Sequence, residues 1–343
     1  MIIVSSDFIQ DPLVSVVIAT YNQVAYIEET ILSVFTQRCS YPFEVIVADD
    51  GSNDGERQLL CDLQKKYSKQ LKLIFNEKNL MVARNYVNAI QEAKGKYIAT
   101  LDGDDYWNTV DKLQRQVDIL EMHSEISIVY TGYRKFESDT KKNMGDVKTW
   151  KCVALNRMGI EAAFAFALGD IDYPLGSSAC FRKDSYLYGC DKYEPLISTP
   201  YCAGEGTILN ISMCMTGYFY FIPEVMVSYR ILPDSLSHFE KKEELILFTF
   251  KYLRQRLLIA ELLKLDKVKI LNHSLWKIFC LAAINGMLKA YRVELEKLEA
   301  DYKTQLPKRC FRIYSNSLMM FLGFGVTVFF SLFKNVKNQI GSL

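Results

Sequence analysis

The sequence has 343 residues, half of them apolar, so it can form a large domain core with a further region beside it. Its 41 lysines and arginines nearly balance 40 aspartates and glutamates, which excludes the broad positive surface of a general nucleic-acid binder. Nine scattered cysteines form no Cys-x-x-Cys pair, and the N-terminal residues lack a secretory signal pattern. We therefore expect a catalytic part inside the cell, with neither a zinc site nor a disulfide framework.

Short apolar runs alternate with longer amphipathic stretches over the first 135 residues. The runs predict strands at residues 14–20, 43–49, 71–75, 96–102 and 126–130. The stretches between them predict helices at residues 26–36, 56–68, 81–93 and 110–122. This alternation is typical of βαβ units around a largely parallel sheet, in which the carboxyl ends of the strands share one edge.

The rest of the chain is less regular and then becomes helical. Residues 136–240 contain the Gly/Ser cluster PLGSSACF and the strand-like run GYFYFI at 217–222, a pattern typical of a lid or an acceptor-binding half. Residues 240–304 carry Leu, Lys and Glu at helical spacing and predict two or three helices. Residues 313–333 have no charged side chain over 21 positions, which predicts a membrane-associated helix, with a buried core helix as the alternative.

The segment TLDGDDYW, at residues 100–107, places three carboxylates directly after a predicted buried strand. Carboxylates this close repel one another, and a shared cation relieves the repulsion. Asp102 and Asp104 can present oxygens on the same side to a hard divalent ion, which completes its shell with diphosphate oxygens and water. The motif predicts a site for Mn²⁺ or Mg²⁺. The alternative is a solvated acidic loop in which Asp105 caps the next helix.

Polar residues also follow the other predicted strands. In the turn ADDGSNDG, Asp50 has no evident local task, and its carboxylate can accept the N3 hydrogen of a uracil ring. The corner formed by Thr20, Tyr21 and Asn22 can line the base and ribose pocket, with core packing as the alternative for the tyrosine. Arg84, near a helix start, can reach a phosphate or face solvent. The shared sheet edge predicts that these groups meet.

Taken in chain order, VSVVIATYN, VADDGSNDG, NLMVARN and ATLDGDDYWNTVDKLQRQVDILE resemble the nucleotide-binding half of an inverting family 2 glycosyltransferase. The resemblance is close over residues 13–123 and looser up to 240. It implies a GT-A fold, which is a Rossmann-like α/β arrangement with a mostly parallel central sheet flanked by helices, here followed by a C-terminal helical extension. The implied domains are a glycosyltransferase domain at 1–240, with halves at 13–135 and 136–240, and the extension at 241–343.

The resemblance also implies roles for individual residues. Asp50 would contact the base, and Asp102 and Asp104 would form the DxD site that bridges a metal to the donor diphosphate, with Asp104 favoured as the direct ligand. The metal would neutralise the charge that builds up on the departing nucleoside diphosphate. Gly103 belongs to the same nucleotide-binding motif. Further candidate contacts to phosphate or acceptor are Asp105, Trp107, Arg230 and His238.

The catalytic base departs from the family pattern. In many relatives the base is the Asp of a Glu-Asp or Gly-Asp pair that precedes an Ile-Pro-Glu motif, which here occupies residues 222–224. Counting back places Gly206 at that position, so the preceding Glu205 is the candidate base that deprotonates an acceptor hydroxyl. The alternatives are a surface acid in a turn for Glu205, and Asp172 as the base.

The sequence thus predicts a metal-dependent inverting glycosyltransferase that transfers a sugar, with UDP-sugars favoured over GDP- and dTDP-sugars, to a hydroxyl of a cell-surface glycan or lipid-linked saccharide. One alternative is a polyprenyl-phosphate glycosyl synthase, whose anionic acceptor needs no base. Another is a non-catalytic protein that binds nucleotide sugars or glycans. The expected partners are the donor, the acceptor and a membrane surface reached through residues 313–333, without nucleic acid. The expected location is the cytoplasm or the cytoplasmic face of the membrane.

Overall fold

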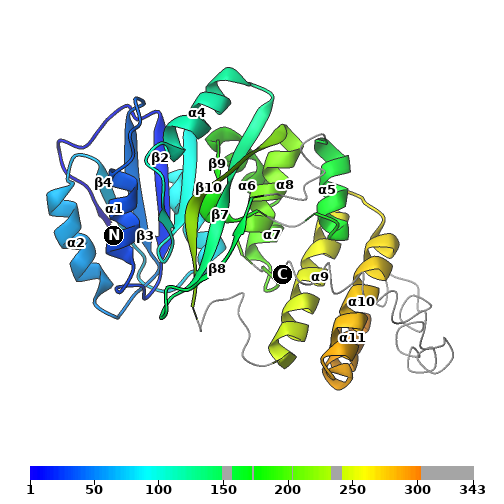
Figure 1. Ribbon diagram of the computed structural model, residues 1–343. Helices are drawn as coiled ribbons and strands as arrows, with labels where there is room; N and C mark the ends of the chain where they lie inside the picture. Colours follow the sequence, from blue (N-terminus) through cyan, green and yellow to red (C-terminus); the bar gives the residue numbers. More distant parts are fainter. Residues whose placement is uncertain (149–156, 172–173, 203, 233–241, 303–343) are drawn as a thin grey trace. The chain divides into compact units, whose positions relative to one another are not determined.

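The computed structural model describes residues 1–148, 157–171, 174–202, 204–232 and 242–302, and everything below concerns these ranges (Figure 1). The chain divides into two compact units, one formed by residues 1–240 with 255–265 and the other by residues 241–254 with 266–343. The expected membrane-associated segment at 313–333 lies outside the described ranges. None of the described helices combines the length and the apolar character that crossing a bilayer requires.

The first unit is built on one mixed sheet. Its strands are β1 (Ile2–Ile3), β2 (Val14–Thr20), β3 (Phe43–Asp49), β4 (Leu71–Phe75), β5 (Tyr97–Asp102), β6 (Tyr106–Trp107), β7 (Ile126–Glu137), β8 (Asn143–Val147), β9 (Cys180–Arg182) and β10 (Tyr218–Ile231). Their order is β1-β4-β3-β2-β5-β9-β7-β10-β6, and β8 pairs with β7. Strands β2 to β5 are parallel to one another, as are β7 and β10, and β9 runs antiparallel between the two groups.

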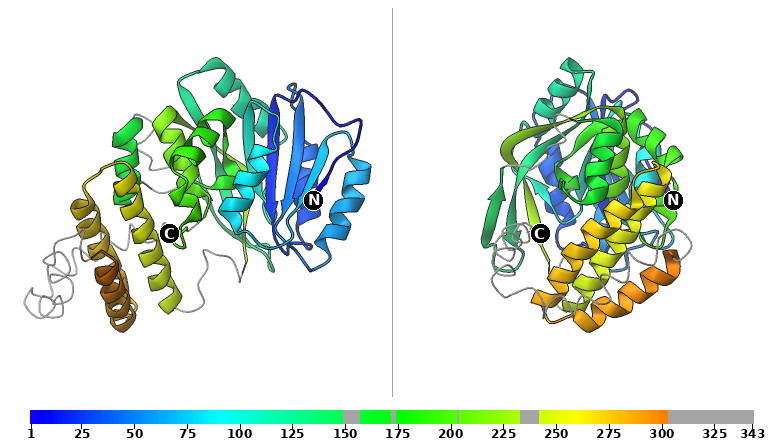
Figure 2. Two further views of the ribbon diagram at one scale, coloured as in Figure 1. Left: turned by 180° about the vertical axis from the view of Figure 1, so that it is seen from behind. Right: turned by 90° about the vertical axis from the view of Figure 1, so that its right-hand side faces the viewer.

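Helices cover both faces of this sheet (Figures 1 and 2). One face carries α1 (Ile27–Phe35), α2 (Glu56–Lys66) and α4 (Lys112–Met122). The other carries α3 (Val82–Gln91), α6 (Lys183–Lys192), α7 (Pro195–Ser198) and α8 (Gly206–Thr216). Helix α5 (Gly159–Leu168) packs against α8, and the short 3-10 helix η2 (Gly176–Ser178) packs against β5.

The remaining helices are α9 (Lys242–Leu262), α10 (Lys267–Ile284) and α11 (Leu288–Tyr302). In the second unit the ring of Tyr291 packs between Phe250 and Phe279, with both ring centroids 5.6 Å away. The buried guanidinium of Arg254 pairs with Glu294 at 3.5 Å. Three helices therefore form where the sequence predicted two or three.

Strands β2 and β3, which lead to the candidate site, are buried along their whole length, and β5 is buried up to Asp102. Every residue of β2 and β3 is buried, as their apolar and β-branched sequences predict for parallel strands covered on both faces. The register places Thr20 opposite Asp49, and Ala19 opposite Asp102. The carboxyl ends of β2, β3 and β5 therefore lie side by side. The expected α/β class, with a mostly parallel sheet and a helical C-terminal region, is confirmed.

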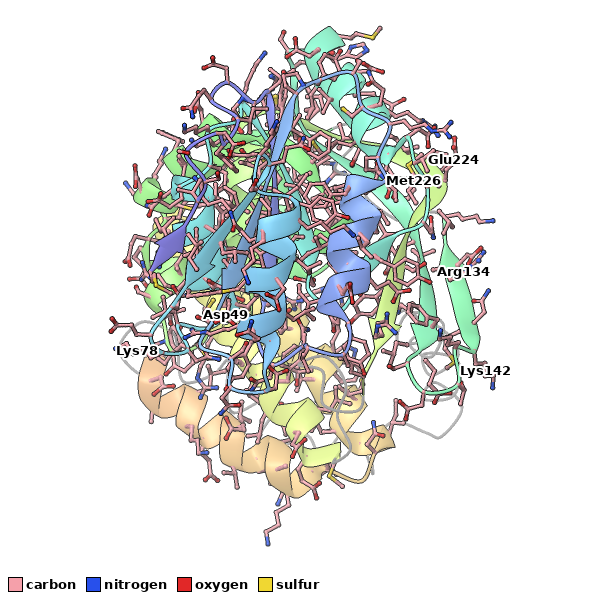
Figure 3. All side chains as sticks on the ribbon, turned by 90° about the vertical axis from the view of Figure 1, so that its left-hand side faces the viewer. Asp49, Lys78, Arg134, Lys142, Glu224 and Met226 are labelled. Carbon is pink, nitrogen blue, oxygen red and sulfur yellow. The ribbon has the colours of Figure 1, made fainter. Side chains whose placement is uncertain are left out.

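Two strands are longer than their apolar runs suggest. The run at 126–130 extends to Glu137, and the run at 217–222 extends to Ile231, because the residues that follow the two runs pair with each other. In this ladder Arg230 lies opposite Phe136. Figure 3 shows Glu224 and Met226 of β10 on the same side of the unit as Arg134 and Lys142, away from Asp49. The longer β10 thus places Arg230 beside the turn that follows β5.

Candidate active site

Residues 102–105, which we call the carboxylate turn, follow β5 directly. Asp102 accepts a hydrogen bond from the hydroxyl of Tyr86 at 2.8 Å, and its backbone N–H donates to the hydroxyl oxygen of Ser177 at 3.1 Å. Asp105 is buried and accepts from the Ser177 hydroxyl at 2.5 Å and from the backbone N–H of Arg230 at 2.9 Å. Asp102 is therefore bound to α3 and η2, and Asp105 is bound to η2 and β10.

Burial and mutual repulsion act on all three carboxyl groups of the turn. Burial raises the pKa of Asp102, and burial together with the other two charges raises the pKa of Asp105 well above its ordinary value. Burial and the charge of Asp102 raise the pKa of Asp104 to about 7, against the opposite effects of Arg230 and Gln23. A cation beside these groups would relieve this cost.

The residues present fit a hard divalent ion. The turn offers carboxylate oxygens, which Mg²⁺ and Mn²⁺ prefer, and Asp104 is not hydrogen-bonded to Tyr86 or Ser177 as Asp102 is. Among the described residues, no three His, Cys, Asp or Glu side chains are arranged as a metal-binding group. An ion held at this turn would therefore complete its shell with oxygens from a ligand or from water.

Glu205 immediately precedes α8 and lies beside the residues that hold the turn. A Cβ added to Gly176 of η2 would lie 3.0 Å from Oε1 of Glu205. The carbonyl of Gly176 accepts a hydrogen bond from Thr100 of β5 at 2.7 Å, which fixes η2 against that strand. Burial, and then the charge of Asp102, raises the pKa of Glu205 to about 7. A carboxyl group that titrates near neutrality has the property required of a general base.

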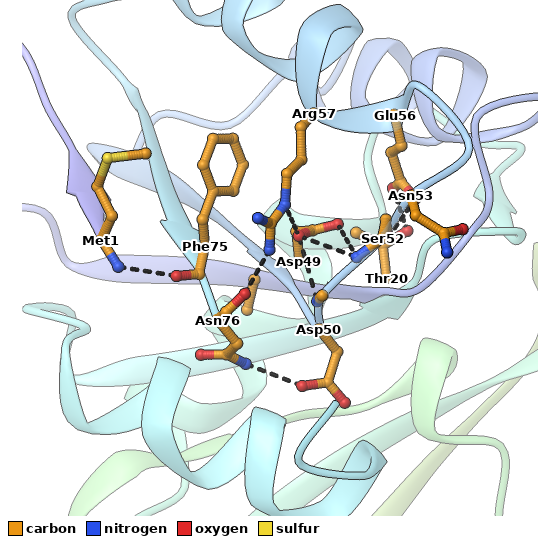
Figure 4. Close-up of polar contacts among 12 residues, drawn as sticks. Met1, Thr20, Asp49, Asp50, Ser52, Asn53, Glu56, Arg57, Phe75 and Asn76 are labelled. Carbon is orange, nitrogen blue, oxygen red and sulfur yellow. Dashed lines mark hydrogen bonds and ion pairs between the residues drawn. The ribbon is translucent and has the colours of Figure 1, made fainter. Parts of the chain in front are cut away.

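Asp50 follows β3 and is buried (Figure 4). Its Oδ1 accepts hydrogen bonds from Nδ2 of Asn76 and from the backbone N–H of Leu80, both at 2.9 Å. Its backbone N–H donates to the carbonyl of Thr20, also at 2.9 Å. Within the described ranges, Oδ2 accepts no hydrogen bond. The carboxylate is thus held in a fixed orientation with one oxygen available to a ligand N–H.

Two carboxylates that sequence reasoning did not select fix the corners around Asp50 (Figure 4). Asp49 accepts from Nε of Arg57 at 2.5 Å. Glu56, fully buried at the start of α2, accepts from the hydroxyl of Thr20 and from the backbone N–H of Gln23, the latter at 2.8 Å. Burial raises the pKa of Glu56. The only sequence signal for Glu56 was its place at a helix start, where an acid is ordinary.

The corner after β2 divides between structural and exposed residues. Thr20 is buried, and its hydroxyl also donates to Oε1 of Gln23 at 3.0 Å. Asn22 adopts a left-handed conformation with φ of 53°, and its side-chain oxygen accepts from the backbone N–H of Asn53 at 2.9 Å. Tyr21 is 46% exposed, so its ring does not belong to the core.

The other predicted site residues differ in their surroundings. Arg84 forms an ion pair with Glu194 at 3.2 Å, and both side chains are partly exposed. Gly103 is closely packed, because an added Cβ would lie 2.5 Å from Oγ1 of Thr20. Trp107 is buried, and its indole N–H donates to the carbonyl of Ser177 at 3.2 Å. The ring of Trp107 therefore lies in the core.

Two further predictions, His238 and the alternative base Asp172, lie outside the described residues. Sequence reasoning also missed Tyr86 and Ser177, which bond the carboxylate turn directly. Ser177 belongs to the Gly/Ser cluster that was attributed to an acceptor-binding half, and this small-residue cluster was the available signal.

The family described as Glycosyl transferase family 2 matches residues 15–186, just over half of the chain. TuaG of Bacillus subtilis, provisionally named a teichuronic acid biosynthesis glycosyltransferase, is 39% identical over 131 residues, which are 37% of this chain and 49% of TuaG. EpsE of the same organism, provisionally named a glycosyltransferase, is 36% identical over 127 residues, 37% of this chain and 45% of EpsE. The matched part of the chain thus spans less than half the length of these curated relatives.

Two solved structures are also similar. Residues 1–349 of TarS from S. aureus, in complex with UDP, give a TM-score of 0.49 at 17% identity, covering 84% of this chain and 91% of that chain. The mannosyltransferase PcManGT from Pyrobaculum calidifontis, in complex with GDP-Man and Mn²⁺, gives a TM-score of 0.48 at 18% identity, covering 91% of this chain and 86% of that chain.

Proposed function

Because this chain belongs to glycosyltransferase family 2, we propose that it transfers a sugar from a nucleotide diphosphate donor, with a UDP-sugar as the expected donor, to an acceptor hydroxyl with inversion. The observation that carries the proposal is the placement of four acidic residues by neighbouring elements of the GT-A fold. Asp50 follows β3, Asp102 and Asp104 end β5 and enter its turn, and Glu205 lies beside η2.

In this proposal Asp104 is the direct ligand of Mn²⁺ or Mg²⁺. Asp102 is held by Tyr86 and Ser177, and Asp105 is committed to Ser177 and to the backbone of β10, whereas Asp104 has neither of these partners. The bound ion would stabilise the charge that develops on the departing nucleoside diphosphate. The raised pKa values of the turn support this role, because a divalent cation offsets the repulsion among its carboxylates.

For the nucleoside, we propose that the free oxygen of Asp50 accepts the N3 hydrogen of the uracil ring. The exposed ring of Tyr21 would stack on the base, while Thr20 and Asn22 shape the corner behind it. Arg84 would contact a phosphate by leaving its pairing with Glu194, which is weak because both partners are partly exposed.

Glu205 is the proposed general base. As the acceptor oxygen attacks the anomeric carbon, the hydroxyl proton passes to the Glu205 carboxylate, and the bond to the nucleoside diphosphate breaks on the opposite face of the sugar. A carboxylate beside the turn favours a hydroxyl acceptor over the polyprenyl-phosphate alternative, because a phosphate acceptor is already anionic. The same carboxylate favours a catalytic protein over a purely binding one.

The wider setting is part of the proposal. The name of TuaG supports a role in assembling a cell-surface polysaccharide, on a lipid-linked or saccharide acceptor at the cytoplasmic face of the membrane. We propose that residues 1–240 form the transferase domain, with nucleotide-binding and acceptor halves meeting near residue 135. Residues 241–343 would then form the extension that contacts the membrane.

A donor screen tests this function. Purified full-length protein is incubated with UDP-, GDP- and dTDP-sugars, with Mn²⁺ or with EDTA, and nucleotide release is measured. We expect hydrolysis of one class of donor that requires the metal and is accelerated by saccharide acceptors more than by a lipid phosphate. The proposal fails if no nucleotide sugar is bound or hydrolysed under any of these conditions.

A further inference from the structure

Arg230, near the end of β10, makes two hydrogen bonds to the carboxylate turn. Its backbone N–H donates to Oδ1 of Asp105 at 2.9 Å, and Nε of its guanidinium donates to the backbone carbonyl of Asp104 at 2.8 Å. A single residue therefore fixes the side chain of one acid and the main chain of the next. Between them these contacts determine where the Asp104 side chain leaves the backbone.

A second nitrogen of the guanidinium is also engaged. Nη2 donates to Oε2 of Glu29 on α1 at 2.7 Å. The central carbon lies 4.4 Å from the ring centroid of Tyr26, 4.8 Å from that of Phe136 and 6.0 Å from that of Tyr106, so the flat cation packs among three aromatic rings. Only 5% of the Arg230 side chain is exposed, which leaves little of it for an external ligand.

We propose that Arg230 is a positioning residue, which sets the backbone of Asp104 for metal binding, and that it does not bind the donor phosphates. This inference rests on the proposed function, because it concerns how the same metal site is held. Glu29 orients Arg230, and Arg230 orients the turn, so the two residues act in sequence. The flat, forked guanidinium makes these contacts simultaneously, which a lysine ammonium at the same position does not reproduce.

Arg230 can affect metal binding because it orients the residue that would bind the metal. Residues that orient a ligand control its affinity for the ion even though they do not touch the ion, and losing one typically weakens binding about 10- to 100-fold. Without Arg230 the carbonyl of Asp104 loses this partner. The hydroxyl of Thr30 still donates to the carbonyls of Gly103 at 2.8 Å and Asp105 at 2.7 Å, so the residues on either side of Asp104 stay anchored while Asp104 itself does not. The carboxylate of Asp104 would then have to be ordered when the ion binds.

The experiment compares Arg230→Lys, Arg230→Gln and Glu29→Gln with the full-length parent. Two quantities are measured: the Mn²⁺ concentration that gives half-maximal donor hydrolysis, and the affinity for UDP in EDTA. We expect both Arg230 variants to raise the required Mn²⁺ concentration at least about tenfold without changing UDP affinity in EDTA. Glu29→Gln should raise the required Mn²⁺ concentration less, because the guanidinium of Arg230 keeps its contact with the carbonyl of Asp104. Glu29 is 55% exposed, so we expect this variant to fold even if Arg230→Gln does not.

The matched control is Arg182→Lys. Arg182 likewise donates to backbone carbonyls, those of Ile126 at 2.8 Å and Leu120 at 2.7 Å, and lies 5.6 Å from the ring of Tyr97. It pairs with the start of β5, at the opposite end from the carboxylate turn. We expect it to lower stability without changing the Mn²⁺ requirement.

Two results would overturn the inference. One is a loss of UDP affinity in EDTA for Arg230→Gln that Arg230→Lys partly restores, which is the behaviour of a phosphate ligand. The other is an unchanged Mn²⁺ requirement in both Arg230→Lys and Glu29→Gln. A parent protein with no metal-dependent activity on any donor would instead refute the proposed function, and it is recognised before any variant is made.

Discussion

The hydroxyl oxygen of Ser177 lies 2.5 Å from Oδ2 of Asp105, and this hydrogen bond joins η2 to the carboxylate turn. The same oxygen accepts from the backbone N–H of Asp102 at 3.1 Å. One side chain from the region after α5 therefore fixes both ends of the turn. Asp104 lies between these two anchored acids.

Replacing Ser177 by alanine removes these two contacts and the contact of its hydroxyl with Oδ2 of Asp102 at 3.1 Å. Because Asp105 is buried, the loss of the partner of its Oδ2 should lower the free energy of unfolding by about 1 to 3 kcal/mol, while Oδ1 keeps its bond from the backbone of Arg230. The required Mn²⁺ concentration should rise. Urea denaturation and Mn²⁺ titration of donor hydrolysis measure the two effects. Ser178→Ala is the matched control, since within the described part of the chain that buried hydroxyl bonds the carbonyl of Leu175 and no residue of the turn. Equal Mn²⁺ requirements in the two variants would contradict this role of Ser177.

Gly103→Ala tests the packing beneath the turn. The new Cβ would lie 2.4 Å from Oε1 of Gln23 and 2.5 Å from Oγ1 of Thr20, so the turn must shift, at a cost of about 1 to 3 kcal/mol. Thermal unfolding measures the loss of stability, and UDP binding with Mn²⁺ measures the shift. In a double variant with Gln23→Ala we expect part of the lost stability to return. Strictly additive losses would show that the clash with Gln23 is not the cause.

The strand ends were predictable because they depend on local patterns. Buried β-branched runs followed by Asp50 and Asp102 predict parallel strands, and parallel strands put their carboxyl ends on one edge. The residues that hold the carboxylate turn were not predictable in this way. Arg230 and Glu29 are 201 positions apart in the chain, and their contact depends on the pairing of the second half of β10 with β7. No periodicity in either segment indicates that pairing.

Side-chain surroundings were also beyond the sequence. Trp107 was a candidate ligand contact. Its indole N–H donates a hydrogen bond to the backbone carbonyl of Ser177 within the core. Glu205 was selected only by counting residues back from the Ile-Pro-Glu motif. In the folded chain its carboxylate lies beside Gly176. Burial and the charge of Asp102, which together raise its pKa, become visible only once the chain is folded.

Glu205→Gln should lower kcat by about 100- to 10,000-fold while leaving UDP affinity unchanged, because the amide cannot take the acceptor proton. The base acts in its ionised form, so parent activity should rise with pH through the raised pKa, at about 7. Residual activity of the variant should lack this rise. Glu224→Gln, which removes an exposed partner of Arg115, is the control. A variant that keeps the parent's kcat would exclude Glu205 as the base.

Lys112 should make stability depend on pH. Its buried ammonium donates to Oε1 of Gln116 at 2.7 Å and lies 4.1 Å from the ring of Trp107, and burial lowers its pKa to about 7. In the unfolded chain a lysine titrates near about 10.4, so between these values the unfolded state binds more protons. The contribution of Lys112 to the free energy of unfolding therefore increases as pH rises from about 7 to about 10.

Lys112→Met removes this contribution. The variant should gain stability relative to the parent at about pH 6, and the gain should shrink toward about pH 9.5, where the parent lysine is largely neutral in the folded state. Urea denaturation of both proteins across this range measures the difference. A difference that stays constant with pH would show that Lys112 keeps an ordinary pKa.

The affinity for UDP, measured calorimetrically with Mn²⁺ and with EDTA in the parent and in Asp104→Asn, tests the central claim most directly. We predict that Mn²⁺ strengthens UDP binding by the parent, and that Asp104→Asn keeps the affinity seen in EDTA but loses the gain from the metal. An Asp104→Asn variant whose UDP affinity still increases with Mn²⁺ as in the parent would contradict the assignment of this carboxylate as the metal ligand.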